Sequence, residues 1–171
     1  LYLTMAIPNT EIKTIYKNSI AYWFDQRMKQ TDRGPLLHAL ETGDCAAAED
    51  FISAQLMQTI SYFDYAESFY HGFMAGLLTN VGSYCVLSNR ESGNGRPDIV
   101  MQTANIRKGR VIILELKTAG SIAEMEAACD RGLAQIETQR YAEPFTNEGY
   151  PEVKKYALSF YKKECMVKKA E

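Results

Sequence analysis

The sequence predicts a mixed α/β domain in which helices precede a small sheet. Apolar residues recur at three- and four-residue steps through roughly the first 80 residues, which is the spacing of helices. Between 84 and 117 the apolar runs are short and are separated by turn-forming residues, which is typical of strands. A helical pattern at 121–141 and a last apolar run at 154–161 follow. The predicted core order is therefore helix, three strands, helix and strand.

The first third of the chain is predicted to consist of helices. Apolar residues recur at helical spacing over 12–28, and the stretch 32–35, which contains Gly and Pro, ends this helix. Two further helical patterns follow, one at 36–40 and one that ends near Ile60. We interpret residues 1–62 as a helical leader whose apolar stripe packs on the core.

Residues 63–171 are predicted to form the core. A helix at about 65–80 opens it, and the three strands that follow have short connections, so each runs antiparallel to the next. Ser121 and Glu124 form a capping box for the second core helix. We interpret the Lys- and Glu-rich end, 162–171, as a solvated terminus. The strands are expected at 84–89, 96–102, 110–117 and 154–161, and turns at Pro144, Asn147, Gly149 and Pro151.

Charge and composition exclude several classes of protein. The 171 residues carry 19 Lys and Arg against 21 Asp and Glu, so any nucleic-acid binding needs a local cationic patch. Four widely spaced cysteines and two histidines do not fit a structural zinc site. The sequence has no apolar run of membrane length and no secretory signal. We expect a cytoplasmic protein with no membrane association and, because the chain begins with Leu1, a piece of a longer protein.

Charged residues end the third strand and begin the second. Glu115, Leu116 and Lys117 close the third strand, and strand alternation places Glu115 and Lys117 on one face. Asp98 starts the preceding strand, where a hairpin can bring its carboxylate near Glu115. Two carboxylates and the Leu116 carbonyl are oxygen ligands suited to Mg²⁺ or Mn²⁺. The Lys117 ammonium could orient a water or stabilise charge on a phosphoryl group.

Each of these residues also fits a simpler role by itself. Glu115 and Lys117 could form an exposed ion pair, and Asp98, which follows Pro97, could be a turn residue that accepts local backbone hydrogen bonds. A strand of Val, Ile and Leu nevertheless has little reason to end in two charges unless a polar site is built there. The combination therefore favours the metal site.

The motif and the order of elements resemble the PD-(D/E)XK nuclease superfamily. Its metal site combines a proline–aspartate pair with a glutamate–x–lysine, as Pro97, Asp98, Glu115 and Lys117 do here. The chain is more closely similar to the nuclease-like C-terminal domain of bacterial and archaeal proteins with an AAA-ATPase-like N-terminal region. The similar stretches are 5–11, 67–73 and 135–137, with 10–62 as the family's helical leader. The resemblance implies a restriction-endonuclease-like core with a mixed central sheet flanked by helices.

The resemblance also implies roles for individual residues. Asp98 and Glu115 would be metal ligands, together with the Leu116 carbonyl, and Lys117 the catalytic lysine. Glu67 would be an acid that the first core helix brings to the metal. His71 lies one turn after Glu67 on the same helix face and fits either a substrate contact or a buried core histidine.

Three further residues are candidates for binding substrate. Gln135 resembles a glutamine that the family carries on its second core helix. Some branches of the superfamily place a tyrosine four residues after it, whereas this chain has Gln139 there and its tyrosine at Tyr141. Arg96 is adjacent to the Pro97–Asp98 pair and is the preferred candidate for a phosphate contact.

The leading functional hypothesis is a Mg²⁺- or Mn²⁺-dependent nuclease that hydrolyses DNA through a metal-activated water. Its predicted partners are nucleic acid and an ATPase-like N-terminal region of the same full-length chain, and a homodimer is left open. One alternative is a non-cleaving nucleic-acid-binding or regulatory module of a larger ATPase-like protein. The other is a metal-independent protein-interaction domain.

Overall fold

The computed structural model of the chain describes residues 30–59, 67–88 and 95–171. Contacts divide the chain into two units, 1–32 and 33–171, and the description below concerns the second. The leader helix predicted at 12–28 lies outside the described residues. The boundary between leader and core at residue 62 stays a prediction.

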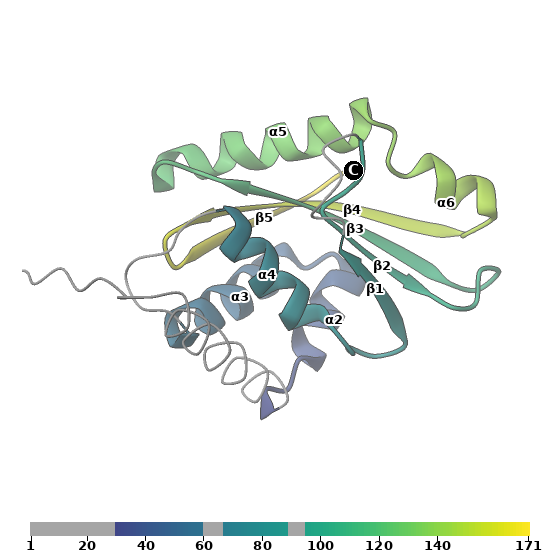
Figure 1. Ribbon diagram of the computed structural model, residues 1–171, viewed down its shortest axis with the longest axis horizontal. Helices are drawn as coiled ribbons and strands as arrows, with labels where there is room; N and C mark the ends of the chain where they lie inside the picture. Colours follow the sequence, from purple (N-terminus) through teal and green to yellow (C-terminus); the bar gives the residue numbers. More distant parts are fainter. Residues whose placement is uncertain (1–29, 60–66, 89–94) are drawn as a thin grey trace, which may run out of the picture. The chain divides into compact units, whose positions relative to one another are not determined.

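Unit 33–171 is built on one five-stranded mixed sheet in the order β1-β2-β3-β4-β5 (Figure 1). The first three strands are antiparallel neighbours, as their short connections predict, and β3 and β4 are parallel. Helices flank the sheet, so the predicted mixed α/β class with a restriction-endonuclease-like arrangement is confirmed. The strands are β1 (Tyr84–Ser88), β2 (Ile99–Thr103), β3 (Arg110–Thr118), β4 (Glu152–Tyr161) and β5 (Glu164–Lys169).

The prediction of a solvated C-terminus is wrong, because β5 pairs antiparallel with β4. Cys165 and Val167 are buried while the residues between and around them are more exposed, which is the two-residue period of an edge strand. Side chains of α3 also accept hydrogen bonds from the backbone N–H groups on the outer edge of β5. Cys165 N donates to Ser53 Oγ, and Val167 N donates to Glu49 Oε1. The lysines of 162–171 suggest a solvated segment when the sequence is considered alone, although lysine is also common on edge strands.

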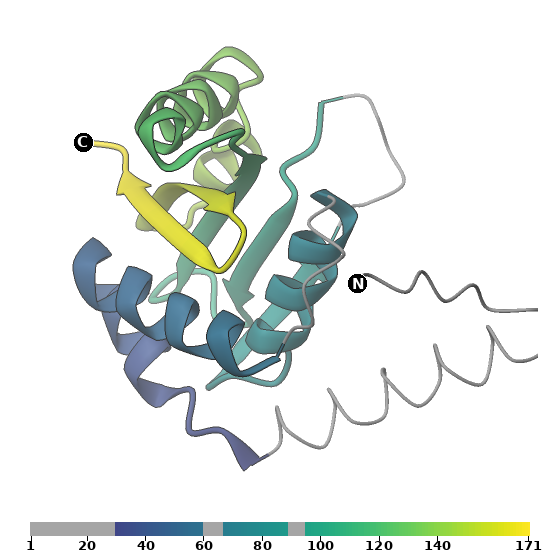
Figure 2. The ribbon, with the colours of Figure 1, turned by 90° about the vertical axis from the view of Figure 1, so that its left-hand side faces the viewer.

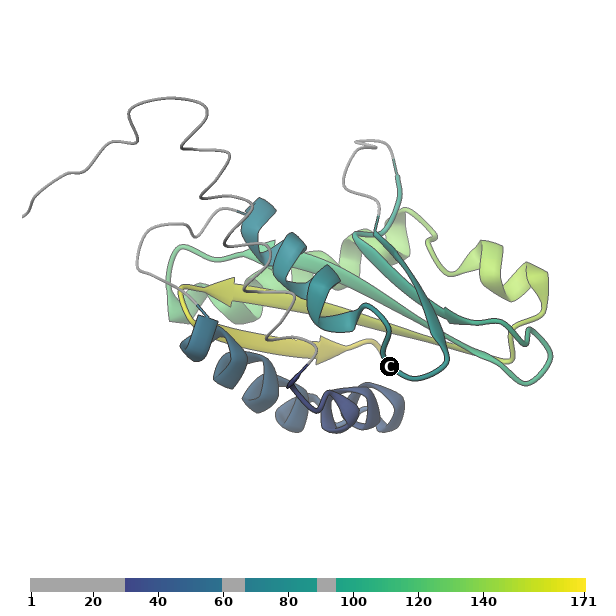
Figure 3. The ribbon, with the colours of Figure 1, turned by 60° about the horizontal axis from the view of Figure 1, so that its bottom comes forward.

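Helices cover both faces of the sheet (Figure 1). One face carries α5 and α6, and the other carries α2, α3 and α4. The β4–β5 hairpin lies between α5 and α3 (Figure 2), and α4 lies across β1 and β3 (Figure 3). The helices are α2 (Gly34–Thr42), α3 (Cys45–Thr59), α4 (Glu67–Leu78), α5 (Met125–Thr138) and α6 (Glu143–Glu148).

Two local predictions on the α5–α6 side are wrong. Pro144 and Gly149, interpreted as turn residues, instead start and stop α6, because proline suits the first helical turn and Gly149, with φ 99°, suits the left-handed residue after the end. Ser121 makes no side-chain cap, since a 3₁₀ turn (Ile122–Glu124) precedes α5. Glu124 Oε2 accepts a hydrogen bond from Gly120 N at 3.1 Å instead.

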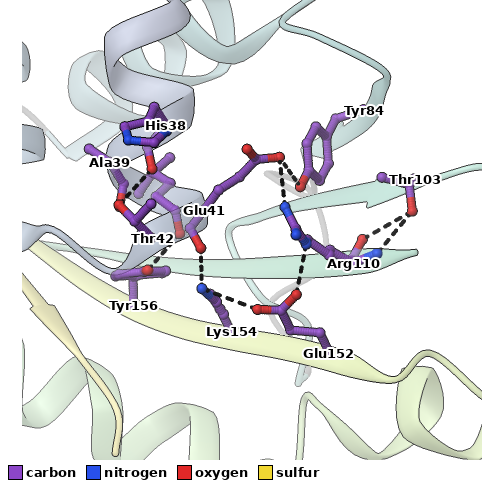
Figure 4. Close-up of polar contacts among 11 residues, drawn as sticks. His38, Ala39, Glu41, Thr42, Tyr84, Thr103, Arg110, Glu152, Lys154 and Tyr156 are labelled. Carbon is purple, nitrogen blue, oxygen red and sulfur yellow. Dashed lines mark hydrogen bonds and ion pairs between the residues drawn. The ribbon is translucent and has the colours of Figure 1, made fainter. Parts of the chain in front are cut away.

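A charged network ties α2 to the strands (Figure 4). Glu41 of α2 accepts a hydrogen bond from Tyr84 and pairs with Arg110, whose guanidinium also pairs with Glu152 at 2.7 Å. Burial, with the neighbouring Glu41 carboxylate, raises the pKa of Tyr84 to about 12, so the tyrosine stays a neutral donor. Tyr156 donates to the Leu40 carbonyl. These contacts hold α2 on the sheet near the start of β3.

Among the helices that the structure describes, none combines the length and the apolar character needed to cross a bilayer.

Candidate active site

Asp98 occupies the point at which β2 and β3 separate. The paired register of the two strands ends at Ile99 and Leu114, and Pro97 has no N–H with which to extend it. The Asp98 side chain takes over, because its Oδ2 accepts a hydrogen bond from Leu116 N at 2.8 Å. The carboxylate is therefore fixed against the backbone of β3 beside the Glu115–Lys117 segment.

Glu115 and Lys117 lie on the face of β3 that α5 covers, as strand alternation predicts. Lys117 Nζ donates to Glu115 Oε1 and to Gln135 Oε1 of α5, both at 2.8 Å. Glu115 is 1% exposed, whereas the Lys117 side chain is 23% exposed. The ion pair between Glu115 and Lys117 is therefore not an exposed one. The Glu115 carboxylate is buried, and the Lys117 ammonium lies between it and solvent.

The pKa of Glu115 is raised above its ordinary value. Burial is the largest cause, and the nearby Asp98 charge adds to it, while the hydrogen bond from Lys117 acts in the opposite direction. The second oxygen, Oε2, is buried, and no group of the described residues donates a hydrogen bond to it. A buried carboxylate oxygen with no partner is costly and calls for an explanation at the site.

Gly132 allows α5 to lie close to these residues. A Cβ at this position would lie 2.8 Å from the Ala157 Cβ of β4, and 3.6 Å from both the Glu115 Cγ and the Lys117 Cγ. Real Cβ atoms do not approach that closely, so a side chain at 132 requires α5 to move away from the sheet. Gly132 thus sets the distance between Gln135 and Lys117.

Replacing Gly132 with Ala is expected to destabilise the protein. The added methyl overpacks the α5–β4 contact at a cost of roughly 1–3 kcal/mol, which outweighs the gain of about 1 kcal/mol from better helix propensity. Gly72→Ala is the matched control, because a Cβ at that position of α4 meets no atom of the described residues within 4 Å. Urea unfolding should show a loss for Gly132→Ala and a gain for Gly72→Ala. Equal gains in both variants would contradict the close approach of α5.

Tyr141 reaches Gln135 although it is not four residues away on the same helix face. After α5 the chain makes a Schellman turn, in which Tyr141 N donates to the Ile136 carbonyl and Arg140 N to the Glu137 carbonyl. This turn folds Tyr141 back, and Gln135 Nε2 donates to its hydroxyl at 3.3 Å. A continuous polar chain therefore runs from Glu115 through Lys117 and Gln135 to Tyr141.

The two candidates on α4 lie in different surroundings. His71 is buried, and its Nε2–H donates to the Asp98 carbonyl at 3.1 Å, since a carbonyl can only accept. This contact positions the backbone of Asp98. Glu67 is exposed at the start of α4. The described residues include no group of three or more His, Cys, Asp or Glu placed to hold a metal, so the structure does not bring Glu67 together with Asp98 and Glu115.

The residues at the end of β3 nevertheless fit a hard divalent cation. The unpartnered Glu115 Oε2 is an anionic oxygen that a cation would satisfy. The Leu116 N–H points to Asp98, and the N–H and C=O of one strand residue point to the same side, so the Leu116 carbonyl faces the same edge. Two carboxylates and a carbonyl are an oxygen donor set, which suits Mg²⁺ or Mn²⁺.

A cavity of about 410 Å³ adjoins the site, and the sequence did not predict it. It is lined by Arg96 and Pro97, directly before Asp98, and by Arg140 and Tyr141 after α5. Arg96 is exposed, and its role in binding substrate stays a prediction. The stretches that line the cavity are distant in sequence, so no local motif reveals it.

The chain matches the PD-(D/E)XK nuclease superfamily over residues 65–170, which include every residue of the site described above. No curated protein and no solved structure matches it significantly. Because the match covers more than half of the chain, the protein belongs to the PD-(D/E)XK nuclease superfamily.

Proposed function

We propose that this protein is a nuclease that uses Mg²⁺ or Mn²⁺ to hydrolyse phosphodiester bonds of DNA. The observation that carries the proposal is the Glu115 carboxylate, which is buried with an unpartnered oxygen between Asp98 and Lys117. A protein that needed only a stable strand would gain nothing from burying this charge. Membership of a nuclease superfamily supports the same reaction class.

Asp98, Glu115 and the Leu116 carbonyl would hold the cation. When bound, the cation would lower the pKa of a coordinated water and neutralise charge on the phosphate. Asp98 is kept in place by its hydrogen bond from Leu116 N and by the contact between His71 and its own carbonyl. The protein thus fixes one carboxylate before any ligand arrives, which reduces the reorganisation required at the site.

Lys117 would act on the reacting phosphate or on the attacking water. An ammonium has three N–H donors, and Glu115 and Gln135 accept two of them, so the third can face the substrate. Gln135 in turn is held by Tyr141. Through these contacts Gln135 and Tyr141 position the Lys117 ammonium. We also propose that both side chains contact the substrate directly.

The competing hypothesis is a module that binds nucleic acid without cleaving it, coupled to an ATPase-like region of a longer chain. Glu67 is exposed and, within the described residues, forms no metal-holding group with the half-buried Asp98 and the buried Glu115, and the lack of a third acid favours this hypothesis. The intact Asp98, Glu115 and Lys117 favour cleavage, since a decayed site has no need to keep a buried charge.

Metal binding and cleavage together test the proposal. Millimolar Mg²⁺ or Mn²⁺ should raise the melting temperature, by roughly 5–10 °C if the metal is present at 100 times its Kd. Cleavage should depend on the metal and stop in EDTA, across a panel of single-stranded, duplex and branched DNA with RNA as comparison.

Asp98→Asn is the diagnostic variant. It keeps an oxygen that can accept the Leu116 N–H, so it should fold normally, but it should lose the metal-dependent rise and the cleavage. Glu148→Gln, which removes an exposed carboxylate from α6, is the control and should behave as the parent. A parent protein without metal binding and without cleavage of any substrate in the panel would reject the nuclease.

A further inference from the structure

The cavity beside the site combines an apolar wall with a cationic rim. Leu87, Val100, Tyr141 and Phe145 supply the apolar part, and Arg96 and Arg140 supply the charges. Its volume of about 410 Å³ lies within the range of small-molecule sites in proteins. Such a lining suits a ligand that has both a flat apolar body and a phosphate.

The aromatic wall is held rigidly. Val100 and Tyr141 belong to a buried apolar cluster against which Phe145 packs. The Phe145 ring also meets Tyr150 edge-on, with centroids 6.4 Å apart, and the Tyr150 hydroxyl donates to the Thr103 carbonyl at 2.8 Å. A fixed aromatic surface is the kind on which proteins stack unpaired nucleobases.

Arg140 occupies a backbone conformation that favours glycine. Its φ is 54°, at the Schellman position where glycine is usual, so the chain keeps an arginine there at a cost in stability. Its ion pair with Glu143, at 3.4 Å, joins two side chains that are 73% and 58% exposed, and such pairs contribute little. Neither the left-handed backbone nor this exposed ion pair favours an arginine at position 140, whereas a phosphate at the cavity rim would.

The cavity is linked to the proposed catalytic residues from two sides. Arg96 and Pro97 lead directly into Asp98, and Tyr141 is joined through Gln135 to Lys117. A nucleotide whose base enters the cavity therefore has its phosphates beside the site. A base that is stacked and paired in a duplex cannot enter without being unpaired, which costs free energy.

We propose that the cavity receives one unpaired nucleobase of the strand that is cut, while Arg96 and Arg140 hold the phosphates next to it. This inference rests on the proposed nuclease function and adds the substrate class to it. The preferred substrate is a single strand, or a duplex with an unpaired nucleotide next to the cleaved bond, rather than a fully paired duplex.

Three fluorescent duplexes of one sequence test the inference by anisotropy, with Ca²⁺ in place of Mg²⁺. One is fully paired, one has a single unpaired base, and one has an abasic nucleotide at that position. The parent should bind the unpaired base about 5- to 150-fold more tightly than the abasic duplex, which is the range that base–aromatic stacking provides. Phe145→Leu, which keeps an apolar side chain, should reduce this ratio toward one.

Arg140→Gly should raise the melting temperature and lower the affinity for DNA. Glycine relieves the left-handed backbone, so the melting temperature should rise by roughly 1–4 °C, while affinity should fall several-fold and the salt slope by about one unit. Asn80→Gly is the backbone control, because Asn80, with φ 58°, follows α4 away from the cavity and carries no charge. Arg107→Gln, in the turn between β2 and β3, is the charge control. Both controls should keep the affinity of the parent.

The outcomes separate the two proposals. A parent that binds the abasic and unpaired-base duplexes equally, or folded Phe145→Leu and Arg140→Gly variants that bind as the parent does, would overturn the cavity assignment even if DNA is cut. A parent that selects the unpaired base but cleaves neither in Mg²⁺ nor in Mn²⁺ would support the cavity and reject the nuclease.

Discussion

Replacing Lys117 with Met should reduce the cleavage rate by roughly 100-fold or more while leaving DNA affinity almost unchanged. In the proposed mechanism the ammonium acts on charge that develops as the phosphodiester bond breaks, so its loss is felt mainly in the transition state. Methionine retains the aliphatic stem, which packs near Gly132, and β3 should still form. Single-turnover cleavage and equilibrium binding of the same oligonucleotide measure the two effects.

Lys155→Met is a close control for this variant. Lys155 lies on the neighbouring strand β4, and its side chain is 22% exposed, against 23% for that of Lys117. It forms an ion pair with Glu137, in the last turn of α5. Its replacement removes a similar charge from the same layer without touching the proposed site. A Lys117→Met protein that folds, binds metal and cuts at the parental rate would rule out the catalytic role.

Glu115→Gln should increase the stability of the metal-free protein and reduce its cleavage rate. Cleavage should fall at least about 100-fold, because an amide is a poor ligand for a hard cation. In EDTA at neutral pH the free energy of unfolding should instead rise, by about 0.5–2 kcal/mol, as is common when a costly functional group is replaced. The metal-dependent rise in melting temperature should disappear.

The stability difference between parent and Glu115→Gln should depend on pH in a defined direction. Burial raises the pKa of Glu115 above its ordinary value near 4.5, so the folded protein holds this proton more tightly than the unfolded chain does. The parent therefore loses stability as pH rises from about 4.5 through the raised pKa. The variant cannot titrate there, so the two proteins should be equally stable in acid and diverge above it. A constant difference at every pH would contradict the buried charge.

The elements around the site follow from local sequence patterns. Short turn-rich connections required β1, β2 and β3 to be antiparallel, and alternation required Glu115 and Lys117 to share a face. Pro97 ended the strand pairing, which left Asp98 free of the ladder. These features depend on residues that are close in sequence or on adjacent strands, so a single sequence suffices to predict them.

Local sequence patterns gave the wrong secondary structure in two segments, β5 and α6. The lysines of β5 suggested solvent, but the strand is defined by two buried residues, Cys165 and Val167, whose N–H groups donate to side chains of α3 more than 100 positions away. Pro144 and Gly149 suggested turns although the same residue types begin and end helices. Whether 164–169 forms a strand and 143–148 a helix depends on what each segment packs against.

The sequence by itself determined the order of α4, β1, β2, β3, α5 and β4, and it placed Asp98, Glu115 and Lys117 where the antiparallel strands β2 and β3 meet at one edge. Only the tertiary structure decided how Gln135 and Tyr141 join them, because one left-handed residue after α5 turns the tyrosine back. It also decided the burial of Glu115, which depends on the close approach that Gly132 permits between α5 and the sheet. Such features depend on backbone angles and on contacts between distant segments, which no periodicity along the chain encodes.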